Sequence, residues 1–174
     1  MKINYELTEE DYLHFNLFHV KQSKTAIKSL NIQRFLTPVF FIIVAFIFSG
    51  IGDMPVVFPL IIFGLISIVW LIFYPKYFYS LVMRQSKKML REGKNDGLLG
   101  EQQLALSEEG IVYTTSNGES RTKWSGIKKV VEDSDFFYLY NSSVSAYILP
   151  KRALSNVEEA KVYFDSNNLL KYPI

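Results

Sequence analysis

A hydrophobic segment over residues 35–74 constrains this chain more than any other feature. Its one polar interruption is SGIGDMPVV at residues 49–57, and Asp53 is the only charged residue between Arg34 and Lys76. Read as helices, residues 35–51 and 56–74 reach about 26 and 28 Å, close to the hydrocarbon thickness of a bilayer. A single uninterrupted helix would be too long and would bury Asp53 at a cost of about 2.5 to 3.5 kcal/mol. The sequence therefore predicts a transmembrane hairpin with Asp53 at its tip.

The alternative interpretation is a buried helical hairpin inside a water-soluble protein. Two helices that are apolar on all sides would then have to be covered on all sides by the rest of the chain. A chain of 174 residues has little material for that cover. The membrane interpretation is therefore favoured.

The charges beside the two apolar segments predict their orientation. Residues 21–34 and 76–94 contain ten cations and a single acid, Glu92. The cations are Lys21, Lys24, Lys28, Arg34, Lys76, Arg84, Lys87, Lys88, Arg91 and Lys94. Positively charged flanks stay in the cytoplasm, so both termini are expected inside and the Asp53 loop outside. The aromatic residues Trp70, Phe73, Tyr74, Tyr77 and Tyr79 fall where the second segment would leave the apolar zone, as interfacial aromatic rings do.

Small residues in the two segments predict how the helices pack. Ala45 and Ser49 are four apart on the first, and Gly64 and Ser67 are three apart on the second, so they would permit a close approach of the two backbones. The alternative explanation is that this spacing arises by chance in segments of apolar composition. Pro38 and Pro59 are expected within the first turn of their helices, where a missing N–H costs little.

The segments next to the hairpin predict a strand and two basic helices. KINYEL at residues 2–7 alternates as a strand does, and Thr8 followed by Glu9, Glu10 and Asp11 predicts the start of a helix over residues 9–33. Lys21, Lys24 and Lys28 would share one face of that helix. After the second span, residues 76–94 are expected to extend the helix into the cytoplasm to about Arg91. There a stripe of Arg84, Lys87, Lys88 and Arg91 lies opposite Val82, Met83, Met89 and Leu90. Such a stripe either contacts anionic lipid headgroups or only sets the topology.

Residues 95–174 predict a separate small domain. After a loop in GKNDGLLGE, short alternating segments predict strands at 103–107, 110–115, 119–124, 127–132, 136–141 and 144–149. Asn117-Gly118 suits a two-residue hairpin turn. Ser155 and Glu158 form a capping box for a final helix whose Val157, Ala160 and Phe164 share one side. The expected fold class is α+β, with an antiparallel sheet or partial barrel capped by a C-terminal helix.

Several stretches of the chain resemble the YcxB-like family of small bacterial membrane proteins. They are YELTEEDYLHFNLFH near the start, the two apolar spans, LSEEGI at residues 106–111, Trp124 with Ile127, and DFFYLYNSSVSAYILPKRAL near the end. The resemblance implies a two-span hairpin in the bacterial inner membrane and a cytoplasmic domain similar to the pleckstrin-homology (PH) group, which has seven strands. KINYEL or an unrecognised segment is expected to supply the seventh strand.

The residues do not assemble a catalytic or metal site. The sequence lacks cysteine, and His14 and His19 are about 140° apart around a helix, so they would not share a metal ion. The acid pairs Glu108-Glu109, Glu132-Asp133 and Glu158-Glu159 fall at turns or a helix start, where acids are common without catalytic duty. GLLGEQ lacks the lysine of a phosphate-binding loop. We therefore expect no enzyme, no metal and no cofactor.

Charge excludes one class of partner and suggests others. Residues 95–174 contain eight Lys and Arg residues against eleven Asp and Glu residues, the wrong sign for nucleic-acid binding. Their cations Arg121, Lys123, Lys128, Lys129, Lys151 and Arg152 are predicted to form a patch for lipid headgroups or a partner protein, or else an ordinary solvated face.

Three functions follow from these observations. The first is a non-enzymatic membrane-anchored module that contacts a protein partner, itself or lipid headgroups. The second is an immunity protein against a membrane-active toxin or bacteriocin, and the third is a subunit of a larger membrane assembly.

Overall fold

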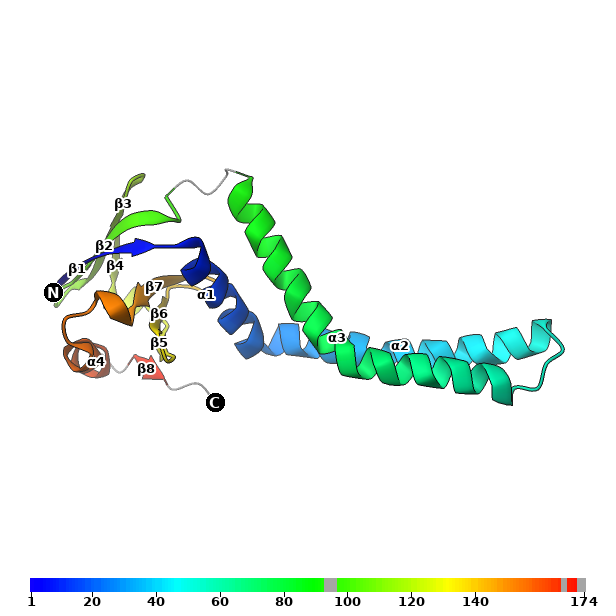
Figure 1. Ribbon diagram of the computed structural model, residues 1–174. Coiled ribbons are helices and arrows are strands. Elements are labelled where there is room, and N and C mark those ends of the chain that lie inside the picture. The colour runs from blue at the N-terminus through cyan, green and yellow to red at the C-terminus, as the bar shows by residue number, and fades with distance from the viewer. Residues whose placement is uncertain (93–96, 167–168, 172–174) are drawn as a thin grey trace. The chain divides into compact units, whose positions relative to one another are not determined.

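The computed structural model describes residues 1–92, 97–166 and 169–171 and divides the chain into two units. One unit contains residues 1–19 and 86–174, and the other contains residues 20–85. The elements labelled in Figure 1 are β1 (Lys2–Leu7), α1 (Glu9–Gln22), α2 (Lys24–Ile51), α3 (Val57–Arg91), β2 (Gly100–Leu106), β3 (Gly110–Thr115), β4 (Gly118–Lys123), η1 (Trp124–Gly126), β5 (Lys129–Glu132), β6 (Phe136–Tyr140), β7 (Ala146–Pro150), η2 (Lys151–Ala153), α4 (Val157–Ser166) and β8 (Leu170–Lys171). Lys94 lies outside the described residues, as does part of the predicted loop GKNDGLLGE. The α+β class is confirmed.

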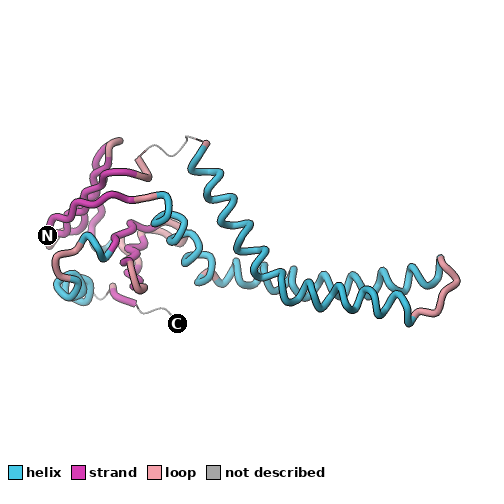
Figure 2. The backbone as a smooth tube through the Cα atoms, in the orientation of Figure 1, coloured by secondary structure: helices cyan, strands magenta, loops and turns pink. Residues whose placement is uncertain are grey.

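The unit of residues 20–85 is helical, and its two long helices carry the apolar segments (Figure 2). Both α2 and α3 are long and apolar enough to cross a membrane. Gly52 ends α2 by donating its N–H to the Phe48 carbonyl, and Asp53 follows with a φ of 45°. The predicted break between two helices is therefore confirmed.

Aromatic rings, more than small residues, hold α2 and α3 together. Phe41 contacts Phe63 and Trp70, with ring centroids 6.2 and 6.4 Å apart. The Tyr74 hydroxyl donates to Gln33 Oε1 at 2.6 Å.

The four small residues predicted to pack the hairpin therefore behave differently from one another. Ala45 and Ser67 are buried, and Ser49 donates its hydroxyl to the Met54 carbonyl. A Cβ atom added to Gly64 would meet nothing within 4 Å among the described residues beyond its own helical turn. The close approach predicted at Gly64 is therefore wrong.

The unit of residues 1–19 and 86–174 contains two four-stranded sheets. Sheet A has the order β1-β2-β3-β4 and is antiparallel, while sheet B has the order β7-β6-β5-β8, in which β8 is parallel to β5. The prediction that KINYEL supplies the seventh strand is confirmed, because β1 pairs with β2. The two-residue strand β8 was not predicted from the sequence.

One hydrophobic core lies between the sheets and two helices. Sheet A contributes alternate residues such as Ile3 and Leu104, while all five residues of β6 are buried. Phe15 of α1 and Phe164 of α4 complete the cluster. The predicted apolar side of the last helix is confirmed, since Ala160 and Phe164 are fully buried. Pro150 is the last residue of β7, an edge strand of sheet B, where a proline is tolerated.

Six local predictions differ from the structure, and four of them concern the helices of the first 91 residues. The expected helix over residues 9–33 is divided at Ser23, whose side chain accepts the Ala26 N–H and starts α2. Lys21 and Lys24 are therefore on different helices. Pro38 lies well inside α2 instead of at its first turn. Met89, predicted on the apolar side of its helix, is exposed.

The other two corrections concern a cap and a turn. Asn156, not Ser155, caps α4, because its Oδ1 accepts the N–H groups of Glu158 and Glu159. The two-residue loop of the β3–β4 hairpin is Ser116-Asn117, and Gly118 already pairs with Thr115. The hairpin is therefore present as predicted, but its two-residue loop begins one residue earlier than predicted.

Candidate functional site

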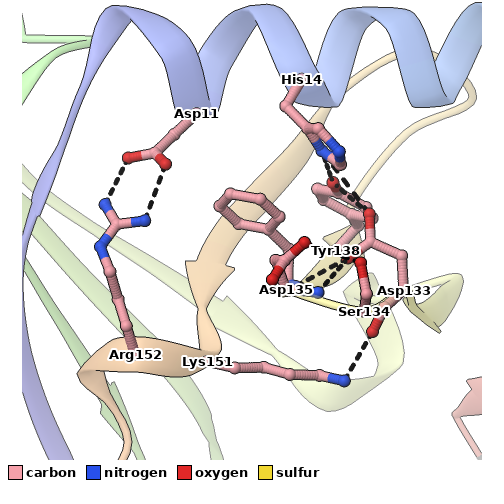
Figure 3. Close-up of polar contacts among 9 residues, drawn as sticks. Asp11, His14, Asp133, Ser134, Asp135, Tyr138, Lys151 and Arg152 are labelled. Atoms are coloured by element: carbon pink, nitrogen blue, oxygen red, sulfur yellow. Dashed lines mark hydrogen bonds and ion pairs between the residues drawn. The ribbon is translucent and has the colours of Figure 1, made fainter.

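A group of hydrogen-bonded and ion-paired side chains joins α1 to sheet B (Figure 3). We call the residues Asp11, His14, Asp133, Tyr138 and Arg152 the α1 clamp. Asp11 and His14 come from α1, Asp133 from the β5–β6 turn, Tyr138 from β6, and Arg152 from η2. Since all five belong to the unit of residues 1–19 and 86–174, the clamp closes a single folded body.

The first half of the clamp is a two-bond pair between a carboxylate and a guanidinium. Arg152 Nη1 donates to Asp11 Oδ1 at 2.8 Å, and Nη2 donates to Oδ2 (Figure 3). Only 7% of the Asp11 side chain is exposed. Burial by itself would raise the pKa of Asp11, but the hydrogen bonds from Arg152 and Thr8 outweigh it, and the pKa lies below its ordinary value. Asp11 is therefore held as a carboxylate.

Local sequence explains how Asp11 reaches that place. The Asp11 N–H donates to Thr8 Oγ1 at 3.2 Å, and the Thr8 N–H donates to Asp11 Oδ2 at 2.9 Å. This reciprocal cap starts α1 and fixes the rotamer of Asp11. The predicted cap at Thr8 is confirmed. The bond from this first-turn acid to the distant Arg152 was not predicted.

The second half of the clamp is a chain from histidine through tyrosine to aspartate. The Tyr138 hydroxyl donates to Asp133 Oδ2 at 2.8 Å, and His14 Nδ1 lies 2.9 Å from the same hydroxyl. Because the single hydroxyl proton points to Asp133, His14 Nδ1 must be the donor to Tyr138. Burial first, and the bond to Asp133 second, raise the pKa of Tyr138. Tyr138 is neutral at physiological pH.

Asp133 is also the anchor of its own turn. Its Oδ1 accepts the backbone N–H groups of Asp135 and Phe136 at 2.9 and 2.7 Å, and its carbonyl accepts from Lys151 Nζ (Figure 3). Both carboxylate oxygens are therefore already bonded. Asp133 therefore positions the turn and the Tyr138 hydroxyl.

A second histidine–tyrosine pair continues the contact along α1. His19 Nδ1 lies 3.2 Å from the Tyr140 hydroxyl, and Lys129 Nζ lies 4.7 Å from the centre of the Tyr140 ring. Burial first, and the charge of Lys129 second, lower the pKa of His19. Burial raises the pKa of Tyr140 to about 12. The two histidines bind separate tyrosines, two residues apart on β6.

The patch predicted on the last third of the chain is divided by these bonds. Lys151 Nζ lies 2.7 Å from Glu132 Oε1 and its side chain is only 18% exposed, while Arg152 is held by Asp11. Burial would raise the pKa of Glu132, but hydrogen bonds from Lys151 and Lys161 lower it. Lys151 and Arg152 therefore join separate elements of the domain, and whether they also contact a ligand stays a prediction.

The other predicted contact residues are exposed. Arg121 and Lys123 lie on β4, where Arg121 Nε is 2.7 Å from Glu119 Oε1. On α3, Lys87 lies 3.0 Å from Glu9 and Lys88 lies 3.7 Å from Glu92. Arg84 and Arg91 are exposed on the same helix. These cations are available at the surface, and whether they bind anything stays a prediction.

Within the described ranges, no group of three or more His, Asp and Glu side chains could hold a metal ion. The predicted absence of a metal, a cofactor and an enzymatic activity stays a prediction. Sequence reasoning did not find Asp11, Asp133 and Tyr138 as a site, because first-turn and turn acids have an ordinary local explanation. Their shared role is visible only in the tertiary structure, where α1 lies on β6.

A comparison with protein families identifies one segment of the chain. The model of the YcxB-like protein family matches residues 106–165, which run from the end of β2 to near the end of α4. This match confirms the family resemblance and contains Asp133, Tyr138 and Arg152. No curated protein and no solved structure matches the chain.

Proposed function

Since residues 106–165 match the YcxB-like protein family, we propose that the chain is a non-enzymatic binding module anchored in the bacterial inner membrane. In this proposal, α2 and α3 cross the bilayer as a hairpin. The two-sheet unit is a PH-like domain in the cytoplasm that contacts a protein partner or lipid headgroups.

The exposed apolar surface of α2 and α3 is the observation that carries the membrane anchor. In the most apolar 18-residue stretch of each helix, only 6% is buried in α2 and 17% in α3. Phe40, Phe58, Ile61 and Leu65 are each at least half exposed. A water-soluble protein rarely exposes so large an apolar surface, whereas lipid would cover it. The buried-hairpin alternative receives no support from this surface.

The arrangement of strands supports a PH-like domain. Seven strands, β1 to β7, form two sheets of four and three strands, to which β8 adds a short parallel strand. The helix α4 follows them and buries Ala160 and Phe164. Seven antiparallel strands followed by a closing helix is the arrangement that the family resemblance implies.

A binding role is favoured over a catalytic one because the acidic side chains that could act in catalysis are bonded to other groups of the domain. The carboxylates of Asp11, Glu132 and Asp133 all have cationic or hydrogen-bond partners inside the domain. For headgroups, we propose Arg84, Lys88 and Arg91 as the first contacts, because they are exposed and follow the proposed inner boundary of α3.

Single-cysteine labelling tests the anchor and its topology. The sequence has no cysteine, so Met54→Cys at the hairpin tip and Ser116→Cys in the β3–β4 loop each give one reactive thiol. In intact cells, a membrane-impermeant maleimide is expected to label Met54→Cys, while Ser116→Cys reacts only after the membrane is opened. Carbonate washing should leave both variants in the membrane fraction.

Two outcomes would contradict the proposal. One is labelling of Ser116→Cys in intact cells while Met54→Cys stays unlabelled, which would invert the topology. The other is release of the full chain from membranes by carbonate, which would make the apolar helices something other than an anchor. Hydrolytic activity abolished by one acidic substitution would overturn the non-enzymatic part.

A further inference from the structure

The strand β4 is an open edge of sheet A. In the order β1-β2-β3-β4 it pairs only with β3 among the described strands, and five of its six residues are exposed. The opposite edge differs, because Arg152 Nη2 donates to the Glu6 carbonyl of β1 at 3.2 Å. An open edge presents backbone donors and acceptors that a further strand can bind.

The hairpin geometry shows which backbone groups of β4 face outward. The two-residue loop Ser116-Asn117 makes Thr115 and Gly118 the flanking pair, which exchanges hydrogen bonds in such a turn. Hydrogen-bonded and non-hydrogen-bonded pairs then alternate along the ladder. Gly118, Ser120 and Thr122 therefore bond to β3, while the N–H and C=O groups of Glu119, Arg121 and Lys123 point to the open side.

The charges on this edge restrict what can pair with it. Charged side chains on an edge strand normally prevent pairing with unrelated strands. Glu119 and Arg121, however, have opposite charges and lie two residues apart on the same face, 2.7 Å from each other. In an antiparallel pair of two β4 strands centred on Ser120, Glu119 of each copy lies opposite Arg121 of the other. The edge is self-complementary in this register.

We propose that the partner of β4 is a second copy of this chain, paired antiparallel about a two-fold axis at Ser120. The outward backbone groups of Glu119 and Arg121 supply the hydrogen bonds, and two Glu119–Arg121 pairs select the register. The contact is isologous, so it closes at two copies. The inference deepens the proposed binding function, because anchoring both copies in one membrane raises their effective concentration.

A disulfide at the two-fold axis tests the contact. Ser120 faces its counterpart in a non-hydrogen-bonded pair, where Cα atoms are about 4.5 Å apart, a separation that a disulfide can span. Under mild oxidation in native membranes, full-length Ser120→Cys is expected to form a dimer. Val162→Cys, which is 67% exposed on α4, is the control for random collision and should stay monomeric.

A charge exchange separates pairing from misfolding. Glu119→Arg and Arg121→Glu each place like charges opposite one another in the homodimer, so self-association measured with two differently tagged copies should fall about tenfold. Mixing the two variants places Arg opposite Glu at both positions, so the mixed pair should associate as well as the unchanged chain. A folding defect would not be repaired by mixing.

Each remaining outcome decides against the proposal. If Ser120→Cys stays monomeric, or if the two charge variants fail to associate with each other, β4 is not the contact between copies. If Arg121→Cys forms the dimer and Ser120→Cys does not, the register is wrong. These results are independent of the anchor, since Met54→Cys labelling can succeed or fail in the same membranes whatever β4 does.

Discussion

At the scale of single residues, the structure distinguishes cations that bond to acids of other elements from cations on an open strand edge. Arg152 and Lys151 look like members of a basic patch in the sequence, but both are bonded to acids from other elements. Arg121 and Lys123 are exposed on an edge strand. The first pair should therefore affect stability, and the second should affect association.

Arg152→Ala is expected to destabilise the domain by about 2 to 3 kcal/mol, because it leaves the buried Asp11 carboxylate without its charged partner. Urea unfolding in detergent can be followed by Trp124 fluorescence in a Trp70→Phe background, since the chain has two tryptophans. Lys123→Ala is the control and should leave the midpoint unchanged. An unchanged midpoint for Arg152→Ala would show that the clamp contributes nothing.

Asp11→Asn should remove part of the acid sensitivity of folding. The pKa of Asp11 is lowered in the folded chain, so its stabilisation is present above the ordinary Asp pKa of about 3.9 and is lost as the pH falls through the lowered value. The stability difference between the unchanged chain and Asp11→Asn should therefore be constant at neutral pH and shrink in acid. A difference that does not change with pH would contradict the assignment.

At the scale of elements, caps and close approaches decide where helices and strands begin and how near they come. Asn156 caps α4 although Ser155 and Glu158 have the spacing of a capping box. Gly110 of β3 lies against β4 so closely that a Cβ atom would meet the Thr122 carbonyl oxygen at 2.3 Å. Each feature can be tested by comparing a substitution at that residue with the same substitution at a nearby residue that lacks the feature.

Asn156→Ala is expected to lower domain stability by about 1 kcal/mol, because two N–H groups of α4 lose their acceptor. Ser155→Ala, one residue earlier, should have little effect. Thermal unfolding of the two variants in the same detergent compares them directly. Equal losses, or a larger loss for Ser155→Ala, would restore the sequence-based capping box.

Gly110→Ala should destabilise the β3–β4 hairpin more than Gly118→Ala does. Both glycines have positive φ, 153° and 145°, so both substitutions strain the backbone. Only at Gly110 does the new methyl group also clash with backbone, since a Cβ at Gly118 would meet nothing within 4 Å among the described residues. We expect an extra loss of about 1 to 3 kcal/mol at Gly110 in chemical denaturation. Similar losses would show that the strands separate easily.

At the scale of the whole molecule, the domain is discontinuous in sequence. The unit with the two sheets uses residues 1–19 as well as 86–174, because β1 completes sheet A and α1 lies on β6. The predicted domain of residues 95–174 therefore lacks a strand and a helix. The apolar hairpin is an insertion between α1 and the rest of this domain.

A fragment of residues 95–174 should consequently be unstable, whereas residues 1–19 joined by a flexible linker to residues 86–174 should fold. Without β1, the buried Leu104 and Leu106 lose their cover on one side. Circular dichroism and cooperative urea unfolding of the two polypeptides provide the measurement. A stable, cooperative fragment of residues 95–174 would show that β1 and α1 are accessories.

Much of the fold could be predicted because it is written in local patterns. The strands at 110–115 and 136–140 and the hairpin after Thr115 follow from alternation and turn residues. The clamp could not be predicted, because Asp11 and Arg152 are 141 residues apart and each has a sufficient local explanation. The small-residue contact at Gly64 failed for a related reason. Spacing along one helix does not state which face meets the other.

The sequence alone determined the two long apolar helices, the break at Asp53 and the antiparallel strands of the rest, because hydrophobic periodicity and turn chemistry act over a few residues. The tertiary structure alone decided that α1 binds β6, that Lys151 and Arg152 bond to acids of other elements, and that β4 is left as the open edge. The physical reason is that ion pairs and strand edges depend on which segments meet, and that choice is made by burial of the shared core.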